Sequence, residues 1–599
     1  MSSSQSPVEA VICKIPLEAL WKSQSLDISR CGTPGRYRLM SCADFIDAGN
    51  LAIHEYVEFP ECTFAAISYV WQGNTPGDLF DERVFNVPVP QDAAPGDPIG
   101  IEVLHDACVA AMARGATHLW LDRICIMQMS ETDKRWQIQR MYDIYQRCHV
   151  CIVVPGGIQC LVRLDEETQW IHRGWTLQEA VAPRPESVHV LFSWRLGSRR
   201  ARAGEVEGNI GEVTPSKSAM TSLSLIVDAS TTGHISIENG ETRLPVEVRL
   251  FSSHPADRSY RDFPFWGETR RVLAPNVGAL ARAMSVDLDQ DAKYHSIWQS
   301  ALMRTSSRPV DMVFSIMGLF GVALKPSDFG KGDRVRATIA LAQAIMKKGG
   351  RATWLAAALN IPPSRQISTF PKFPRTTVSG KAFVKIAGGL LEVSLMMENE
   401  YPVAAALVPM PTGSMDDEGY ITFTAKATCL QSLPDSPAGT FSEPARPAHV
   451  QAIDGSCWAT EEDTNGVEGE AFAVIVGFFV GYYPGATPAH DTKNIRAMIV
   501  EKHAHERFHV RSYLKLSRVT RAWVQAWPER TFSIGGPALK VVEDLGEELP
   551  VVSVPREQYL NNPHSGYHNG VPSLEDQVIR KTRWAFSQKT LEQKYGNMR

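Results

Sequence analysis

The stretch AAISYVWQG at Ala65–Gly73 predicts a buried strand whose end carries polar and aromatic groups. Two similar stretches follow it, LWLDRICIMQ at Leu119–Gln128 and RGWTLQEA at Arg173–Ala180. Each combines an apolar strand or a helix start with tryptophan and polar side chains. Open α/β sheets bind ligands where neighbouring strands end, so these groups are expected to share a pocket. The residues concerned are Ser68, Tyr69, Trp71, Asp122, Gln128, Arg173, Trp175 and Glu179.

The segment around these stretches, from Phe64 to Val190, alternates apolar strand-like runs with runs of helical period. This alternation is typical of βαβ units and predicts an α/β fold, with a largely parallel sheet and flanking helices. The predicted strands are Ala65–Val70, Leu119–Ile126, Val150–Val154 and Ser187–Phe192. The predicted helices are Ile101–Arg114, Trp136–Arg147 and Gly174–Ala182, and the polar run Ser130–Lys134 provides N-cap residues for the second.

The remainder of the chain divides by composition and periodicity. Between Leu196 and about Gly240, small and polar residues without steady periodicity predict an insertion or a mobile loop. Helices are predicted at Val277–Ser285, Tyr294–Met303 and Arg334–Lys348, the last with Asp333 as N-cap. The expected parts are an N-terminal extension (1–60), the α/β core (61–195), the loop insertion with its helical continuation (196–360), a β-rich C-terminal domain (361–572) and a helical or flexible tail (573–599).

Composition and charge narrow the classes of function. The 599 residues include 44% hydrophobic and 21% charged residues, which is typical of a folded globular protein. The net charge of −5 does not attract phosphate backbones, so no nucleic-acid partner is expected. The 11 scattered cysteines predict reduced thiols, and Cys148 and Cys151 predict core packing rather than a metal site.

The N-terminal residues and the longest apolar run do not predict export or a membrane span. The N-terminus lacks a basic region followed by an apolar one, as a secretory signal would have. The longest apolar run, Ala471–Tyr483, is too short for a membrane-spanning helix, and its β-branched and aromatic content predicts a buried strand. We therefore expect a cytoplasmic protein without a membrane partner.

The three stretches together, in this order and at this spacing, resemble the fungal heterokaryon incompatibility (HET) domain. A fourth stretch, Arg304–Phe320, resembles the segment that follows this domain in many such proteins. The resemblance covers about Phe64–Phe320. The chain departs from the usual family pattern at Gln72, where glycine is common, and at Arg123 and Met127. These departures leave the predicted fold unchanged and bear on whether an activity is retained.

The resemblance implies a TIR-like domain, that is, a flavodoxin-like sheet whose enzymatic members cleave nicotinamide from NAD+ with one glutamate. The sequence Trp-Thr-Leu-Gln-Glu is similar to the TIR helix that carries this residue, with Thr176 in place of cysteine. It implies Glu179 as the catalytic residue and NAD+ as a substrate rather than a bound cofactor. No GxGxxG motif follows the first strand, which argues against redox use of the nucleotide.

The same resemblance implies roles for other side chains of the expected pocket. Trp71 or Trp175 would stack on nicotinamide, Arg173 would pair with a phosphate, and Ser68 with backbone amides near Gly73 would hold another. The implied substrate-binding residues are Ser68, Tyr69, Trp71, Gly73, Asp122, Arg173, Trp175 and Gln178, and no metal ligands are implied.

Structural roles for these residues stay open alternatives. Trp71, Trp120 and Trp175 can instead be core or rim aromatics, because large aromatic side chains dominate packing. Asp122 can cap backbone amides or pair with Arg123 or Arg173, and Glu179 can form an ion pair with Arg173.

Three different functions are compatible with the sequence. The first is an effector of incompatibility or programmed cell death, regulated by self-association or by a partner protein. The second is a non-enzymatic adaptor that uses the tryptophan-rich face to bind protein. The third is a biosynthetic enzyme that acts on another small molecule on the same fold.

Overall fold

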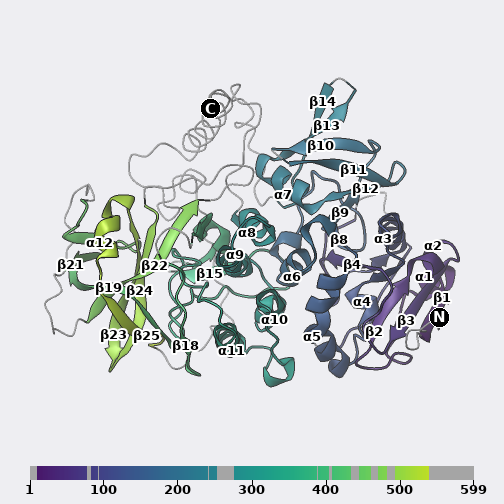
Figure 1. Cartoon of the computed structure of the whole chain (residues 1–599). Coiled ribbons are helices and arrows are strands. Elements are labelled where there is room, and N and C mark those ends of the chain that lie inside the picture. Colours follow the sequence, from purple (N-terminus) through teal and green to yellow (C-terminus); the bar gives the residue numbers. More distant parts are fainter. Residues whose placement is uncertain are drawn as a thin grey trace, which may run out of the picture. The chain divides into compact units, whose positions relative to one another are not determined.

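The computed structural model describes residues 10–537, except 77–82, 92, 205, 241, 252–274, 387–388, 404–407, 434–443, 461–469 and 482–492. The chain forms two compact units (Figure 1). Unit 1 contains 1–277, 304–332 and 377–380, and unit 2 contains 278–303, 333–376 and 381–599. The predicted tail, 573–599, lies outside the described residues.

Unit 1 is built on a mixed sheet, with twelve strands among the described residues in the order β1-β3-β2-β7-β4-β8-β9-β12-β11-β10-β13-β14. Its centre, β7-β4-β8-β9, is parallel, and the strands on either side pair antiparallel. The bounds are β1 Ala10–Pro16, β2 Tyr37–Ser41, β3 Asn50–Tyr56, β4 Phe64–Tyr69, β7 His118–Trp120, β8 Val150–Val154, β9 Val188–Ser193, β10 Arg199–Ala203, β11 Val206–Thr214, β12 Ser218–Ser222, β13 His234–Asn239 and β14 Thr242–Glu247. A separate short pair is formed by β5 Val84–Phe85 and β6 Ile99–Gly100.

The helices of unit 1 cover the parallel centre of the sheet. Helices α2 and α3 contact each other and both contact β7, whereas α5 and α6 contact each other and α6 contacts β4. Every residue of β4 and β8 is buried, as expected for strands with helices over them. The helices are α1 Leu17–Ser23, α2 Cys42–Ile46, α3 Ile101–Ala113, α4 Asp122–Cys125, α5 Glu131–Arg147, α6 Trp175–Val181, α7 Leu223–Thr232 and α10 Asp311–Met317.

Most elements predicted for the α/β core are confirmed. Strands β4, β8 and β9 and helices α3 and α6 lie within a residue or two of the predicted bounds. Helix α5 begins at Glu131, five residues before the predicted start, because Ser130 accepts a hydrogen bond from the amide of Asp133. The cap predicted from the polar run is therefore present.

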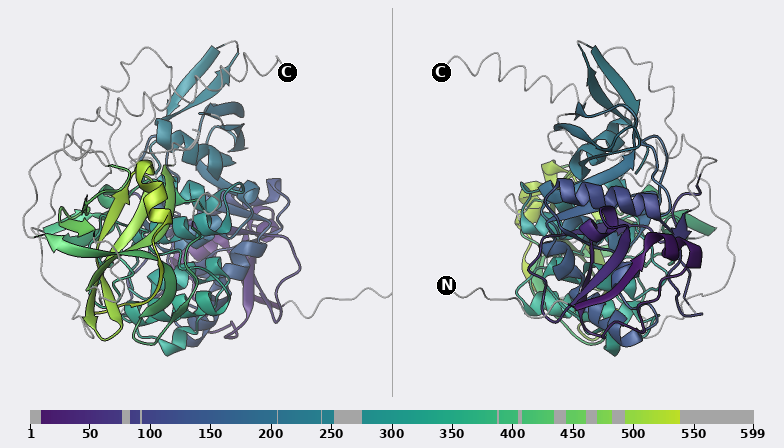
Figure 2. Two further views of the ribbon diagram at one scale, coloured as in Figure 1. Left: turned by 60° about the vertical axis from the view of Figure 1, so that its left-hand side comes forward. Right: turned by 90° about the vertical axis from the view of Figure 1, so that its right-hand side faces the viewer.

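Two predictions in unit 1 are wrong. The strand predicted at Leu119–Ile126 ends at Trp120, and Asp122–Cys125 turns into the short helix α4. A short apolar run does not distinguish a buried strand from a buried helix. The loop predicted after Leu196 instead contains strands β10–β14 and helix α7, and Figure 2 shows the β13–β14 hairpin projecting from the unit. Strand β14 is exposed over most of its length, so it lacks the apolar alternation that identifies strands.

Unit 2 combines helices with the β-rich region that the sequence predicts. Its pairings close on themselves, since β22, β23, β24, β25 and β19 each pair with the next and β19 pairs again with β22. The helices are α8 Pro275–Met284, α9 Gln290–Leu302, α11 Arg334–Lys347 and α12 Arg521–Gln525. The strands are β15 Phe383–Ile386, β16 Gly389–Glu392, β17 Glu400–Pro402, β18 Ser414–Met415, β19 Ile421–Leu433, β20 His449–Gln451, β21 Cys457–Thr460, β22 Ala471–Gly481, β23 Ile495–Ala504, β24 Arg507–Leu516 and β25 Glu529–Ile534.

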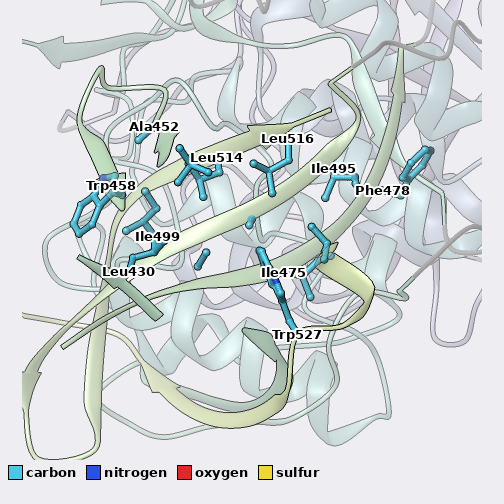
Figure 3. Packing of buried hydrophobic residues seen from close by; sticks show 14 of the residues in the cluster. Leu430, Ala452, Trp458, Ile475, Phe478, Ile495, Ile499, Leu514, Leu516 and Trp527 are labelled. Carbon is cyan, nitrogen blue, oxygen red and sulfur yellow. The ribbon is translucent and has the colours of Figure 1, made fainter. Parts of the chain in front are cut away.

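A hydrophobic cluster forms the core of this second sheet. Ile475 and Phe478 on β22, Ile499 on β23 and Leu514 on β24 pack together with Trp527, as Figure 3 shows. All eleven residues of β22 are buried, which confirms the buried strand predicted from the apolar run at Ala471. In the part of the chain that the structure describes, no helix has the length and apolar character needed to span a bilayer.

Candidate functional site

The predicted catalytic residue, Glu179, lies on α6 at the centre of a buried polar group. Its side chain is almost fully buried, with 7% of the residue exposed. The hydroxyl of Ser68, near the end of β4, donates to the Glu179 carboxylate at 2.6 Å. The same hydroxyl accepts a hydrogen bond from Nε1 of Trp170 at 2.8 Å. Two consecutive hydrogen bonds, from Trp170 to Ser68 and from Ser68 to Glu179, therefore hold the Glu179 carboxyl in position.

The surroundings of Glu179 raise its pKa from 4.5 to about 8. Burial is the main cause, because the charged carboxylate loses its hydration. The hydrogen bond from Ser68 lowers the pKa, the negative charge of Asp122 raises it, and the guanidinium groups of Arg304 and Arg173 lower it. At neutral pH the group is therefore mostly protonated, and a moderate change in pH ionises it.

A second carboxyl, that of the half-buried Asp122, lies two residues after β7 and begins α4. It accepts hydrogen bonds from the hydroxyl of Tyr69 at 2.6 Å and from Nε1 of Trp71 at 2.8 Å. Burial raises the pKa of Asp122, and these two hydrogen bonds oppose the rise. Gln128 donates to the backbone carbonyl of the same residue at 2.9 Å. The end of β4 thus delivers two predicted site residues, Tyr69 and Trp71, to the carboxyl that follows the neighbouring strand β7.

Arg173 and Trp175, on either side of the start of α6, are held by other parts of unit 1. Nη1 of Arg173 donates to the backbone carbonyls of Thr377 and Val378. The side chain of Trp175 hydrogen bonds with the half-buried Asp311, whose pKa is raised to about 6, mainly because its carboxyl loses hydration. Both contacts connect α6 to segments that lie far away in the sequence.

Gly73 and Gln178 occupy restricted positions. A Cβ atom on Gly73 would lie 1.9 Å from the carbonyl oxygen of Gly156, so only glycine fits there. The amide N–H of Gly73 donates to the carboxylate of Asp97 at 2.7 Å. Gln178 is buried, and its Nε2 has no hydrogen-bond partner within the described residues.

Three residues of this site were not predicted from the sequence: Trp170, Arg304 and Asp311. Arg304 is buried, and its Nη1 donates to the carbonyl of Arg173 at 2.9 Å and to the hydroxyl of Thr176 at 2.7 Å. Burial lowers the pKa of Arg304 to about 9, while the charge of Glu179 opposes this shift. The available signal was the fourth stretch, which begins with Arg304 and contains Asp311.

The structure gives partners to the residues for which purely structural roles were expected as alternatives. The Glu179 carboxylate accepts from Ser68, and the guanidinium of Arg173 donates to backbone carbonyls. Asp122 is bound by Tyr69 and Trp71 side chains. Trp120 is 2% exposed and packs edge-on against Tyr145, so it is a core residue.

The two cysteines of the CxxC motif are both buried, which fits the packing role predicted for them. Cys151 contacts the backbone carbonyl of Glu179 through its thiol, and Cys148 that of Tyr145. Across the described ranges, no group of three His, Cys, Asp or Glu side chains is arranged to hold a metal ion.

Comparison with known proteins identifies one part of the chain. Residues 64–161 match the family model described as Heterokaryon incompatibility protein (HET). The match spans β4 to β8 and includes the first two sequence stretches, and it ends before the third, which carries Glu179. No match was found among curated proteins or among solved structures.

Proposed function

We propose, from the premise that residues 64–161 are a HET domain, that the chain takes part in an incompatibility or cell-death response. We assign to unit 1 a nucleotide site that cleaves the N-glycosidic bond of NAD+. The observation that carries this assignment is the placement of Glu179 beside the ends of β4 and β7, held by Ser68 and influenced by Asp122. Two carboxyls with raised pKa values in one buried site are a common signature of catalytic groups.

The arrangement of the sheet supports a TIR-like site. The parallel strands β4, β7, β8 and β9 stand in the spatial order second, first, third, fourth along the chain. This is the order of flavodoxin-like sheets, which bind ligands beyond the carboxyl ends of their strands. Asp122 and Tyr69 lie at those ends.

The proposed reaction is hydrolysis of the bond between nicotinamide and ribose. The bond between the nicotinamide nitrogen and ribose C1′ breaks, both electrons go to the nicotinamide ring, and C1′ becomes cationic. Water then adds to C1′ and releases one proton. In its ionised form Glu179 would stabilise the cationic ribose or accept that proton. Trp71 or Trp175 would stack on the leaving nicotinamide.

The test is incubation of the purified full chain with NAD+ and detection of nicotinamide by chromatography. We expect release by the wild type, and loss of release in Glu179→Gln, which retains an oxygen to accept from Ser68. Glu392→Gln is a matched control, because Glu392 is a buried glutamate in unit 2 that also accepts a serine hydrogen bond. Equal release by wild type and Glu179→Gln would remove Glu179 from the role.

Absence of release in every protein, together with self-association that depends on concentration, would favour the adaptor function. The wider role is tested separately by induced expression in a fungal cell. Loss of viability that Glu179→Gln abolishes would connect the site to cell death. Loss of viability that persists in Glu179→Gln would show that death does not depend on this carboxyl.

A further inference from the structure

The short segment Thr377–Gly380, which we call the strap, belongs to unit 1, although the residues on both sides of it belong to unit 2. Hydrogen bonds with Arg173 and Thr305 attach it to the candidate site. Its carbonyls at Thr377 and Val378 accept from Nη1 of Arg173. The amide N–H of Thr377 donates to the hydroxyl of Thr305 at 2.7 Å. The strap thus contacts the residue that the sequence assigns to phosphate binding.

The residues that receive the strap are themselves firmly placed. Thr305 is completely buried, and its amide donates to the carbonyl of His172 at 2.7 Å. The amide of Gly174 donates in turn to the carbonyl of Thr305 at 2.8 Å. The backbone of Arg173 is thereby flanked by paired neighbours, and its carbonyl accepts from Arg304. The strap is therefore attached to a hydrogen-bonded segment just before α6.

The strap gives Arg173 neutral partners. Two backbone carbonyls satisfy the N–H donors of Nη1 but carry no net negative charge. Burial lowers the pKa of the Arg173 guanidinium, and the charges of Asp311 and Glu179 oppose this shift. A phosphate or pyrophosphate group would offer charged oxygens to the same donors, and such hydrogen bonds are roughly twice as strong as neutral ones. The strap therefore occupies donors that an anionic ligand would use better.

We infer that the strap is an autoinhibitory contact, which occupies Nη1 of Arg173 until a pyrophosphate-bearing nucleotide displaces it. This inference rests on the proposed nucleotide site and adds its regulation. A toxic activity benefits from such a contact, because the ligand affinity is reduced by the fraction of molecules in which the strap is closed.

The inference is tested with variants that weaken the hydrogen bonds of the strap and leave Arg173 unchanged. We call the strap closed when it contacts Arg173 and Thr305, and open when it has left them. In Thr305→Val, the amide of Thr377 has no acceptor in the closed state, so the population of the open state is expected to increase. Thr377→Ala is a second variant at the strap itself, where the lost hydroxyl donates to the carbonyl of Ser379 at 2.8 Å. The control is Thr531→Val in β25, which removes an exposed hydroxyl pair with Thr424 at 2.9 Å.

Two measurements on the full chain decide the outcome. Hydrogen exchange of the strap amides is expected to rise in both variants and in wild type with inorganic pyrophosphate. Pyrophosphate affinity is expected to rise roughly threefold to tenfold in the variants, the factor that one net hydrogen bond corresponds to. Unchanged or weaker affinity with faster strap exchange would overturn the inference, as would unchanged exchange in both variants.

Failure of this inference is distinguishable from failure of the proposed activity. Tighter pyrophosphate binding without nicotinamide release in any variant would keep the strap and reject NAD+ cleavage. Nicotinamide release that is the same in wild type and in variants with faster strap exchange would keep the activity and reject the autoinhibitory role.

Discussion

The Ser68 hydroxyl donates to the Glu179 carboxylate at 2.6 Å and joins residues that are 111 positions apart. Ser68 also accepts a hydrogen bond from Nε1 of Trp170 at 2.8 Å, so its hydroxyl joins the two side chains. A hydroxyl that donates to Glu179 favours the ionised carboxylate and lowers its pKa. The pKa of Glu179 thus reflects a balance between burial and this bond.

Removing the bond should move that balance toward the neutral acid. In Ser68→Ala we expect the pKa of Glu179 to rise further above about 8, because burial remains and the stabilising donor is lost. The stability of the fold should fall by about 1–3 kcal/mol, since Nε1 of Trp170 also loses its acceptor. The pH profile of nicotinamide release and chemical denaturation measure the two effects. A profile shifted to lower pH would contradict the assigned direction.

Asp122→Asn should move the same pKa in the opposite direction. The charge of Asp122 raises the pKa of Glu179, so a neutral amide in its place should lower it. The amide group offers one acceptor where Tyr69 and Trp71 both donate, so we expect a loss of about 1–3 kcal/mol in unfolding free energy. NMR titration of the carboxyl in both proteins gives the comparison. Equal pKa values would show that the two carboxyls do not interact.

The raised pKa of Glu179 also makes stability depend on pH. Between pH 4.5 and about 8 the folded state keeps a proton that the unfolded chain has released. The unfolding free energy should therefore fall as pH rises through this window, by at most about 1.4 kcal/mol per pH unit from this group.

The difference between wild type and Glu179→Gln isolates that contribution. Other raised carboxyls, such as Asp311, act in both proteins and cancel. Denaturation curves at several pH values should show wild type losing stability relative to the variant up to about pH 8 and no further change above it. A constant difference from pH 5 to pH 8 would mean that the folded protein does not raise this pKa.

The sequence was sufficient to predict the centre of unit 1, for a physical reason. Strands β4 and β8 are buried on both faces, so their apolar runs are continuous, and helix α5 has both a cap and a clear apolar period. Strand β7 was predicted too long, because Ile124 and Cys125 are buried in α4 just as they would be in a strand.

The candidate site was only partly predictable from the sequence. The three stretches include Ser68, Asp122 and Glu179, because each lies next to a recognisable strand or helix. The contacts of Arg304 and the strap depend on pairing across more than a hundred residues, which local pattern does not encode. Long-range pairing of this kind decides which predicted side chains are actually available to a ligand.

Glycine is required at position 73 by the fold itself, whether or not this residue contacts a ligand. Its implied role was to hold an anion with backbone amides, yet the tight approach of the Gly156 carbonyl already requires glycine. We expect Gly73→Ala to destabilise the fold by more than about 2 kcal/mol, because a backbone atom cannot move aside as a flexible side chain can. Gly332→Ala is the control, since no atom lies within 4 Å of a Cβ there. Thermal unfolding of the two variants measures the difference, and equal melting temperatures would contradict the close approach at Gly73.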